Sequence, residues 1–192
     1  HFFMLSINDL QNGSVIKIDN DPYQVLEVKH LHMGRGGSSV QTRIKNLRTG
    51  QVLERNYKPA DSFEETEVEK QEAMFLYAHR EEFWFCEKSN PKQRFMLKHD
   101  ILGDQSVFLK PNLPVTALVF EGAILAVELP IKVDYKVVEA PPAVRGNTAQ
   151  GGTKLVTLEG GAKINAPLFI NEGDVVRVNT QVGEYAERIE KA

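Results

Sequence analysis

Several features common in proteins are missing from this chain. It has one cysteine, Cys86, so no internal disulfide is possible and a reducing compartment is expected. It has no run of about eighteen apolar residues, which excludes a membrane-spanning helix, and we expect no membrane partner. The start lacks the charged, apolar and small-residue sections of a secretory signal, so we expect a cytoplasmic protein.

Signatures of catalysis and of metal binding are equally scarce. The chain has no Gly-x-Ser-x-Gly motif, which marks the nucleophile of many hydrolases. The carboxylates of residues 64–72 lie in a polar stretch rather than in a candidate pocket. His30 and His32 would share one face of a strand, and Cys86 or His99 could join them, but the spacing matches no known zinc site. We expect no catalytic residue, no cofactor and no metal, and histidines that face solvent or RNA.

Charge is segregated along the chain, although the formal net charge is only −3. One stretch carries seven basic residues against the single acid Glu54: Lys29, Arg35, Arg43, Lys45, Arg48, Arg55 and Lys58. Six acids follow within residues 61–72, against Lys70 alone. Because salt screens charges beyond about 10 Å, a local basic surface can hold phosphates on an acidic protein. A solvated charged face is the ordinary interpretation of such a run, and the imbalance favours RNA modestly.

Short β-rich segments separated by turn residues predict an all-β protein. In the first part of the chain, residues 14–19 and 23–28 flank the turn formers Asn20-Asp21-Pro22. Residues 40–46 alternate in polarity, and a turn at residues 48–50 leads into a further strand at residues 51–57. Two further sets of strands follow, at residues 72–78, 82–87, 115–120 and 123–128, and then at 131–138, 155–158, 163–166, 174–180 and 185–189. A short helix is expected within residues 91–104. Small barrels of the oligonucleotide-binding (OB) type are common at this size.

The most specific signal lies near the C-terminus. Residues 161–188 read Gly-Ala-Lys-Ile-Asn-Ala-Pro-Leu-Phe-Ile-Asn-Glu-Gly-Asp-Val-Val-Arg-Val-Asn-Thr-Gln-Val-Gly-Glu-Tyr-Ala-Glu-Arg. This sequence closely resembles the signature of the bacterial translation elongation factor P family. The resemblance extends from Met4 to the end, and includes the glycine-flanked tip at residues 31–38 and the segment 145–149.

The resemblance implies three consecutive small β-barrels. These are a KOW/SH3-like domain with a tip loop at residues 4–66, an OB-fold at 67–130 and a C-terminal OB-fold at 131–192. It also implies an elongated, L-shaped arrangement that mimics tRNA. We expect residues 1–3, which precede Met4, to be an expression remnant.

The resemblance further implies a monomeric, non-enzymatic factor of the 70S ribosome. Such a factor binds between the exit and peptidyl sites, contacts rRNA and stabilises peptidyl-tRNA or initiator tRNA in the peptidyl site. It thereby promotes peptide bond formation at consecutive prolines. Proline is rigid and a poor nucleophile, so orienting the reactants can recover the lost rate while the ribosome supplies the chemistry.

By this resemblance, Arg35 is the tip residue that reaches toward the acceptor end of the peptidyl-tRNA. Gly34, Gly36 and Gly37 surround it and permit a close approach of the backbone to RNA, while the guanidinium offers five donors. Many relatives carry a lysine here that is extended by a β-lysyl group, a reaction closed to a guanidinium with a pKa above about 12. Another branch carries an arginine rhamnosylated from dTDP-rhamnose. Rhamnosylation by an arginine-modifying glycosyltransferase is therefore one hypothesis and an unmodified tip is the other, because the Gly-Arg-Gly setting is closer to the lysine branch.

The remaining candidate contacts to RNA or the ribosome fall into three groups. The basic candidates of the first domain are Arg43, Lys45, Arg48 and Arg55. A second group matches the third-domain loop that approaches the exit-site mRNA codon in relatives, with asparagine in place of the usual aspartate: Arg145, Gly146, Asn147 and Thr148. Tyr185 and Arg188 match C-terminal positions linked to ribosome contact, although such a tyrosine could simply cap a barrel.

Two other interpretations of the function stay open. The chain could be a paralogue of the factor with a different stall specificity. It could also be a general OB protein that binds single-stranded nucleic acid, in which Phe83-Trp84-Phe85 would stack bases. For this triplet we expect instead that alternate members fill the second barrel, because a strand buries every other residue.

Overall fold

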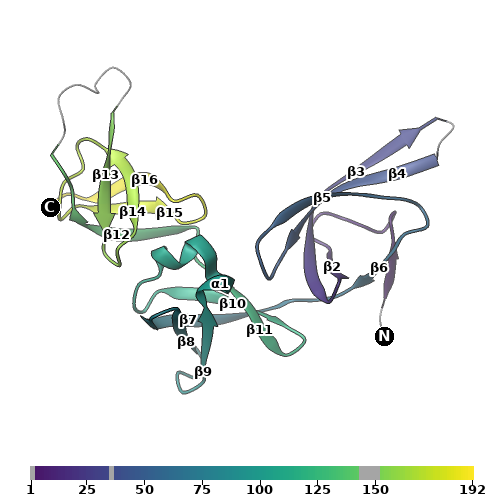
Figure 1. Ribbon diagram of the computed structural model, residues 1–192, viewed down its shortest axis with the longest axis horizontal. Coiled ribbons are helices and arrows are strands. Elements are labelled where there is room, and N and C mark those ends of the chain that lie inside the picture. The colour runs from purple at the N-terminus through teal and green to yellow at the C-terminus, as the bar shows by residue number, and fades with distance from the viewer. Residues whose placement is uncertain (1–2, 35–36, 143–151) are drawn as a thin grey trace. The chain divides into compact units, whose positions relative to one another are not determined.

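The computed structural model is all-β and describes residues 3–34, 37–142 and 152–192 (Figure 1). In these ranges the strands form three sheets, of six, five and five strands. The chain divides into two compact units, residues 1–71 with 117–126 and residues 72–116 with 127–192. The all-β architecture predicted from the sequence is confirmed.

The first sheet has the strand order β1-β6-β2-β3-β4-β5. Its strands are β1 (Met4–Ser6), β2 (Val15–Ile18), β3 (Asp21–Met33), β4 (Gly37–Asn46), β5 (Val52–Tyr57) and β6 (Ser62–Glu65). Alternate side chains point inward and form one buried cluster of Ile7, Leu10, Ile16, Val25, Val40, Ile44 and Phe63. The acidic run of residues 61–72 contains β6, which pairs with both β1 and β2.

The turn between β2 and β3 is shorter than the sequence suggested. Ile18 pairs directly with Asp21, so only Asp19 and Asn20 form the turn. Both have positive φ, 49° and 68°, as a two-residue type I′ hairpin requires. Pro22, expected in the turn, belongs to β3.

The second sheet has the order β11-β10-β7-β8-β9. Its strands are β7 (Glu69–His79), β8 (Glu82–Glu87), β9 (Arg94–Lys98), β10 (Pro114–Phe120) and β11 (Ala123–Glu128). The helix α1 (His99–Leu102) and the 3-10 helix η1 (Gly103–Phe108) connect β9 to β10. The helix predicted within residues 91–104 therefore exists, but it begins only after a strand that sequence reasoning missed.

The third sheet has the order β14-β13-β12-β15-β16. Its strands are β12 (Lys132–Glu139), β13 (Thr153–Leu158), β14 (Lys163–Pro167), β15 (Val175–Asn179) and β16 (Glu184–Glu190). Counted from the first strand of each set, the second and third sheets share one order, 3-2-1-4-5. This repeated five-stranded topology is that of the OB-fold predicted for both.

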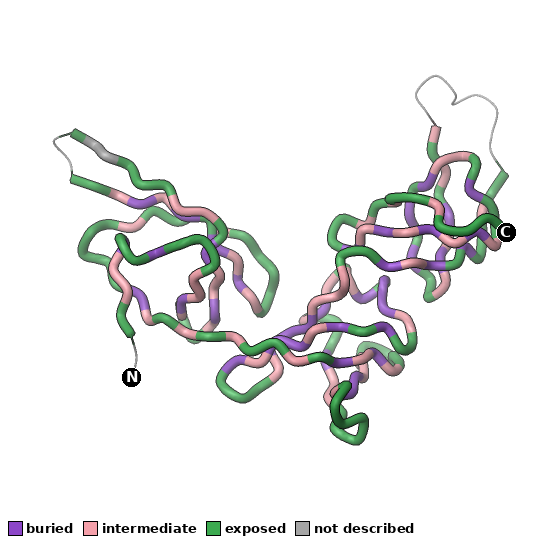
Figure 2. The backbone as a smooth tube through the Cα atoms, turned by 180° about the vertical axis from the view of Figure 1, so that it is seen from behind, coloured by how far each residue is buried: buried purple, intermediate pink, exposed green. Residues whose placement is uncertain are grey.

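Each sheet has its own buried positions, which alternate with exposed ones along the strands (Figure 2).

In the second unit, Lys110 follows η1 and ties it to the third sheet. Its Nζ donates to the Asp134 carbonyl at 2.6 Å and to Oε1 of Glu159 at 3.0 Å. In the described part of the chain, no helix is long and apolar enough to cross a membrane.

Candidate nucleic-acid interface

The β3–β4 hairpin presents the predicted tip. The two strands pair from Tyr23 opposite Asn46 to Met33 opposite Gly37, so three residues, 34–36, connect them. Arg35 is the central residue of this connection in the sequence, and Arg35 and Gly36 lie outside the described residues. The register therefore shows that the two strands pair up to the residues on either side of this connection.

Among the strands that the structure describes, none pairs with the end of this hairpin as a third strand. The pairing of β5 with β4 begins at Val40, and the pairing of β2 with β3 reaches only Gln24. The last three pairs of the hairpin, opposite Ser39, Ser38 and Gly37, therefore form a two-stranded ribbon that leaves the sheet (Figure 1). A ribbon of this kind can enter a narrow space that the barrel itself cannot.

The tip glycines have different backbone requirements. Gly37 has φ +86°, a conformation that residues with a side chain rarely adopt. Gly34 is exposed and shows no such φ, and, chain neighbours aside, no described residue has an atom within 4 Å of a Cβ added there or at Gly37. Gly37 is thus required by the backbone, whereas Gly34 has no such requirement and would leave room for a side chain.

Arg43 and Lys45 share the outer face of β4, because they alternate with the inward-pointing Thr42 and Ile44. Arg43 is exposed, and acids stand opposite it on both neighbouring strands, Glu27 on β3 and Glu54 on β5. Glu27 also forms an ion pair with Lys29, whose Nζ lies 3.1 Å from Oε1 of Glu27. This face is therefore a mixed surface of cations and acids rather than a uniformly basic one.

Arg55 faces the opposite side of the sheet. It pairs with Thr42, which is 1% exposed and points inward, and Thr42 Oγ1 donates to the Arg55 carbonyl at 3.1 Å. The Arg55 side chain lines a cavity of about 240 Å³ together with Tyr23, Leu53 and Tyr57. The basic candidates of the first domain are thus divided between two faces.

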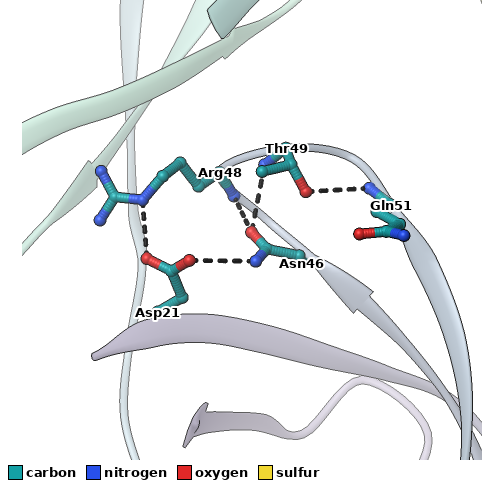
Figure 3. A network of polar contacts seen from close by, with 5 residues as sticks. All are labelled: Asp21, Asn46, Arg48, Thr49 and Gln51. Atoms are coloured by element: carbon teal, nitrogen blue, oxygen red, sulfur yellow. Dashed lines mark hydrogen bonds and ion pairs between the residues drawn. The ribbon is translucent and has the colours of Figure 1, made fainter. Parts of the chain in front are cut away.

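Arg48 lies at the far end of β4 from the tip, where it belongs to a network around the β4–β5 turn (Figure 3). Its Nε donates to Asp21 at 2.7 Å, and the Asn46 amide donates to the other Asp21 oxygen at 3.1 Å. Asn46 Oδ1 in turn accepts the backbone N–H groups of Arg48 and Thr49. Burial alone would raise the pKa of Asp21, but the Arg48 and Asn46 hydrogen bonds hold it below its ordinary value. Since β4 has ten residues, this network is about 30 Å from the tip.

Arg188 contacts two side chains within the third-sheet domain, Asp174 and Phe169. Its guanidinium lies 3.5 Å from the carboxylate of Asp174 and 5.1 Å from the ring centroid of Phe169. Asp174 is 1% exposed and also accepts the backbone N–H groups of Asn171 and Ala192. Burial alone would raise the pKa of Asp174, and these bonds together with Arg188 hold it below its ordinary value. The Phe-Ile-Asn-Glu-Gly-Asp signature therefore builds a turn that the C-terminal strand closes.

The other C-terminal candidates are placed less directly. Tyr185 is half-buried and pairs with the fully buried Val178, as a residue that closes a barrel would. The loop candidates of the third domain lie outside the described residues: Arg145, Gly146, Asn147 and Thr148. Among the described residues, no group of three or more His, Cys, Asp or Glu side chains could hold a metal ion.

One aromatic pair lies on the outer face of the second barrel, and the sequence provided no reason to pair Tyr77 with Trp84. Phe85 is 0% exposed within the second barrel, as alternation predicts, while Trp84 points to the opposite face. There its ring stacks on that of Tyr77, with centroids 6.3 Å apart and planes inclined by 18°. Alternation within the triplet could have placed Trp84 outside, but the position of Tyr77 depends on a bulge that no sequence pattern announces.

Comparison with protein families gives three matches in chain order. The model described as the elongation factor P KOW-like domain matches residues 6–63. The elongation factor P OB domain matches residues 68–127, and the elongation factor P C-terminal model matches residues 133–188. Each match falls on one of the three sheets.

Individual relatives match over nearly their whole length. The chain is 40% identical to elongation factor P of Moorella thermoacetica, covering 96% of this chain and 100% of the relative. It is 37% identical to elongation factor P of Natranaerobius thermophilus, covering 97% and 98%. Among solved structures, a translation initiation factor eif-5a family protein from Naegleria fowleri is similar at a TM-score of 0.49 and 15% identity, covering 67% of this chain and 99% of that one.

Proposed function

Because this chain belongs to the elongation factor P family, we propose that it binds the 70S ribosome between the exit and peptidyl sites and assists peptide bond formation there. As a member of that family it is a translation factor and not an enzyme. The observation that carries the proposal is the match of all three family models in order along one chain.

In this proposal the β3–β4 hairpin holds Arg35 beside the peptidyl-tRNA in the peptidyl site. The two-stranded end of the hairpin supports the assignment, because it leaves the sheet and ends in a three-residue connection centred on Arg35. A guanidinium offers five donors in a fixed plane, which suits phosphate and ribose oxygens. Holding the tRNA in place restores peptide bond formation at consecutive prolines by orientation, without proton transfer to the factor.

The remaining surfaces have supporting roles. Arg43 and Lys45 contact rRNA from the outer face of β4, and the segment with Arg145, Gly146, Asn147 and Thr148 approaches the exit-site mRNA codon. Arg55 is a weaker candidate because it faces the cavity side, and Arg48 and Arg188 act mainly through Asp21 and Asp174. We place the three domains at residues 4–66, 67–130 and 131–192, in a monomeric protein of the cytoplasm.

Ribosome co-sedimentation tests this function against general binding of single strands. The full chain should pellet with ribosomes that carry peptidyl-tRNA and have a vacant exit site, and Arg35→Ala should pellet less. A general single-strand binder would instead prefer free RNA, with a steep loss of affinity as salt rises. Equal pelleting with ribosomes that carry peptidyl-tRNA and with ribosomes that carry no tRNA would contradict the proposal.

The modification of Arg35 is a separate question with its own test. A rhamnosyl group added by a glycosyltransferase would extend the reach of the tip and add hydroxyl groups for RNA. The intact mass of the protein from its native host should exceed that of the bare sequence by one deoxyhexose residue. A mass equal to the bare sequence would leave an unmodified arginine as the working tip.

A further inference from the structure

The outer face of strands β7, β8 and β9 carries a row of apolar rings and sulfur that the proposed function does not use. Trp84 pairs with Tyr77 on β7 and with Met96 on β9, so the three side chains lie across one face of the sheet. Tyr77 is 46% exposed, and Trp84 and Met96 are half-buried. We call these three residues the aromatic row.

A β-bulge is what brings Tyr77 to this face. The register of β7 against β8 shifts between Phe75 and Tyr77, leaving Leu76 as the extra residue. Phe75 points into the barrel, where it is 4% exposed, and without the bulge Tyr77 would point the same way. Bulges often re-aim a side chain beside a functional site. Here the result is a pair of nearly parallel rings on the outer face, with Tyr77 exposed and Trp84 half-buried.

A hollow lies next to the aromatic row on the same face. One step further along the strands, His79 pairs with Glu82, and Glu82 pairs with Lys98. Together with Arg80 and Glu81 of the β7–β8 turn, they line a cavity of about 560 Å³. Glu82 is the next residue after Trp84 on this face, about 7 Å along β8, so the polar hollow begins one residue pair beyond the aromatic row.

From this arrangement we infer that the outer face of β7–β8–β9 binds an unstacked base of single-stranded RNA, with its sugar and phosphate in the hollow. Flat aromatic rings stack any base, and single-strand binders combine such rings with a positively charged groove that follows the backbone. Arg94 and Lys98 stand on either side of Met96 along β9 and provide cations for the backbone. The carboxylates of Glu81 and Glu82 can accept from a ribose hydroxyl or a base amino group.

The position in the barrel favours RNA over a protein partner. Strands β8 and β9 are the second and third strands of a five-stranded sheet with OB order. That face is the one with which OB-folds bind oligonucleotides. A protein partner would call for a broader apolar patch, whereas this one is a single row bounded by charged groups on β9.

Trp84 is the only tryptophan of the chain, so its fluorescence reports on this face without labelling. A short single-stranded oligoribonucleotide should quench it saturably, and the same sequence in a duplex should quench it much less, because its bases are already stacked. Tyr77→Ser should weaken binding by about 5- to 140-fold, the range for losing one stacked ring. Tyr77→Phe keeps the ring and should bind as the parent does.

Charge variants complete the test. Lys98→Gln should weaken binding and reduce its salt dependence. Lys92→Gln is the control, because Lys92 is exposed in the β8–β9 connection, before β9 begins. Absence of quenching, equal quenching by duplex, or unchanged affinity of a folded Tyr77→Ser protein would each overturn the inference. Quenching by whole ribosomes but not by RNA would do so too, by indicating a protein contact.

This inference does not depend on the hairpin tip. Arg35→Ala should be quenched by the oligoribonucleotide like the parent chain, even though it loses its action on ribosomes. A failure of either proposal can therefore be told from a failure of the other.

Discussion

The hydroxyl group of Tyr135 donates a hydrogen bond of 2.6 Å to the carbonyl oxygen of Phe108. Tyr135 is 0% exposed on β12, and Phe108 is the last residue of η1, so the bond joins the third sheet to the segment before β10. Burial raises the pKa of the Tyr135 phenol, which therefore stays protonated and remains a donor. One buried side chain thus fixes a connection on which the second unit depends.

Replacing Tyr135 with phenylalanine tests this connection. The ring would still fill its site, but the Phe108 carbonyl would lose its buried donor. The free energy of unfolding should fall by about 1–3 kcal/mol, the range for an unsatisfied buried polar group. Urea denaturation gives this value, and Tyr77→Phe, at an exposed tyrosine, should change it by less than about 0.5 kcal/mol. Equal effects of the two variants would refute the role given to Tyr135.

The Lys110–Glu159 ion pair predicts a pH dependence of stability. Burial would raise the pKa of Glu159, but the Lys136 backbone N–H and Lys110 hold it below its ordinary value. A carboxyl group whose pKa is lowered by folding stabilises the fold at pH values above its ordinary pKa of 4.5. This stabilisation is lost as the pH falls through the pKa of the folded protein. Lys110→Met should therefore raise the pKa of Glu159 and flatten the loss of stability below about pH 5.

Denaturation of the parent and of Lys110→Met at neutral and acidic pH measures this difference. Lys163→Met removes an exposed lysine of the same unit and should leave the pH profile unchanged. Parallel profiles for the parent and Lys110→Met would show that the ion pair does not set the acid stability.

The network around Asn46 predicts an effect on stability alone, because it lies at the other end of β4 from the hairpin tip. Asn46 is 6% exposed. Its side-chain amide donates to Asp21 and accepts from two backbone N–H groups of the β4–β5 turn. Asn46→Leu removes these bonds and leaves two backbone N–H groups without their acceptor. It should destabilise the first unit by about 2 kcal/mol. Thermal unfolding measures the effect, and Gln51→Ala at an exposed site of the same turn is the control.

Gly34 and Gly37 form a matched pair of test sites at the tip. Alanine fits in the open space at both, but only at Gly37 must it adopt a left-handed backbone. Gly37→Ala should therefore cost about 1–2 kcal/mol and reduce ribosome binding, whereas Gly34→Ala should fold normally. Equal stability of the two variants would show that the hairpin does not need the glycine at position 37.

Most of the strands could be predicted from alternation, because a half-buried strand shows its period of two in the sequence. The strand β6 was missed because its surface positions are glutamates, which obscure the single inward residue Phe63. Strand β9 was missed because it runs directly into α1, so the polar residues around His99 suggested one helix. Pairing with neighbouring strands, which no local pattern contains, decides both cases.

The candidate site was predictable in part, for the same reason. The tip position of Arg35 is predicted from its flanking glycines and from the family resemblance, and the structure shows that Met33 and Gly37 are the last pair of the hairpin before it. The sequence grouped Arg43, Arg48 and Arg55 by their charge alone. The structure places them on two faces and in a turn network, because facing and partners depend on register and on distant residues such as Asp21.

Translation of a message with consecutive prolines, in a reconstituted system lacking any related factor, tests the central claim most directly. Addition of this protein should restore full-length product, and addition of Arg35→Ala should not, although the variant unfolds at the same temperature as the parent. Full rescue by Arg35→Ala would show that the hairpin tip is not the acting group. No rescue by the parent chain, in its native or modified form, would contradict the proposed function itself.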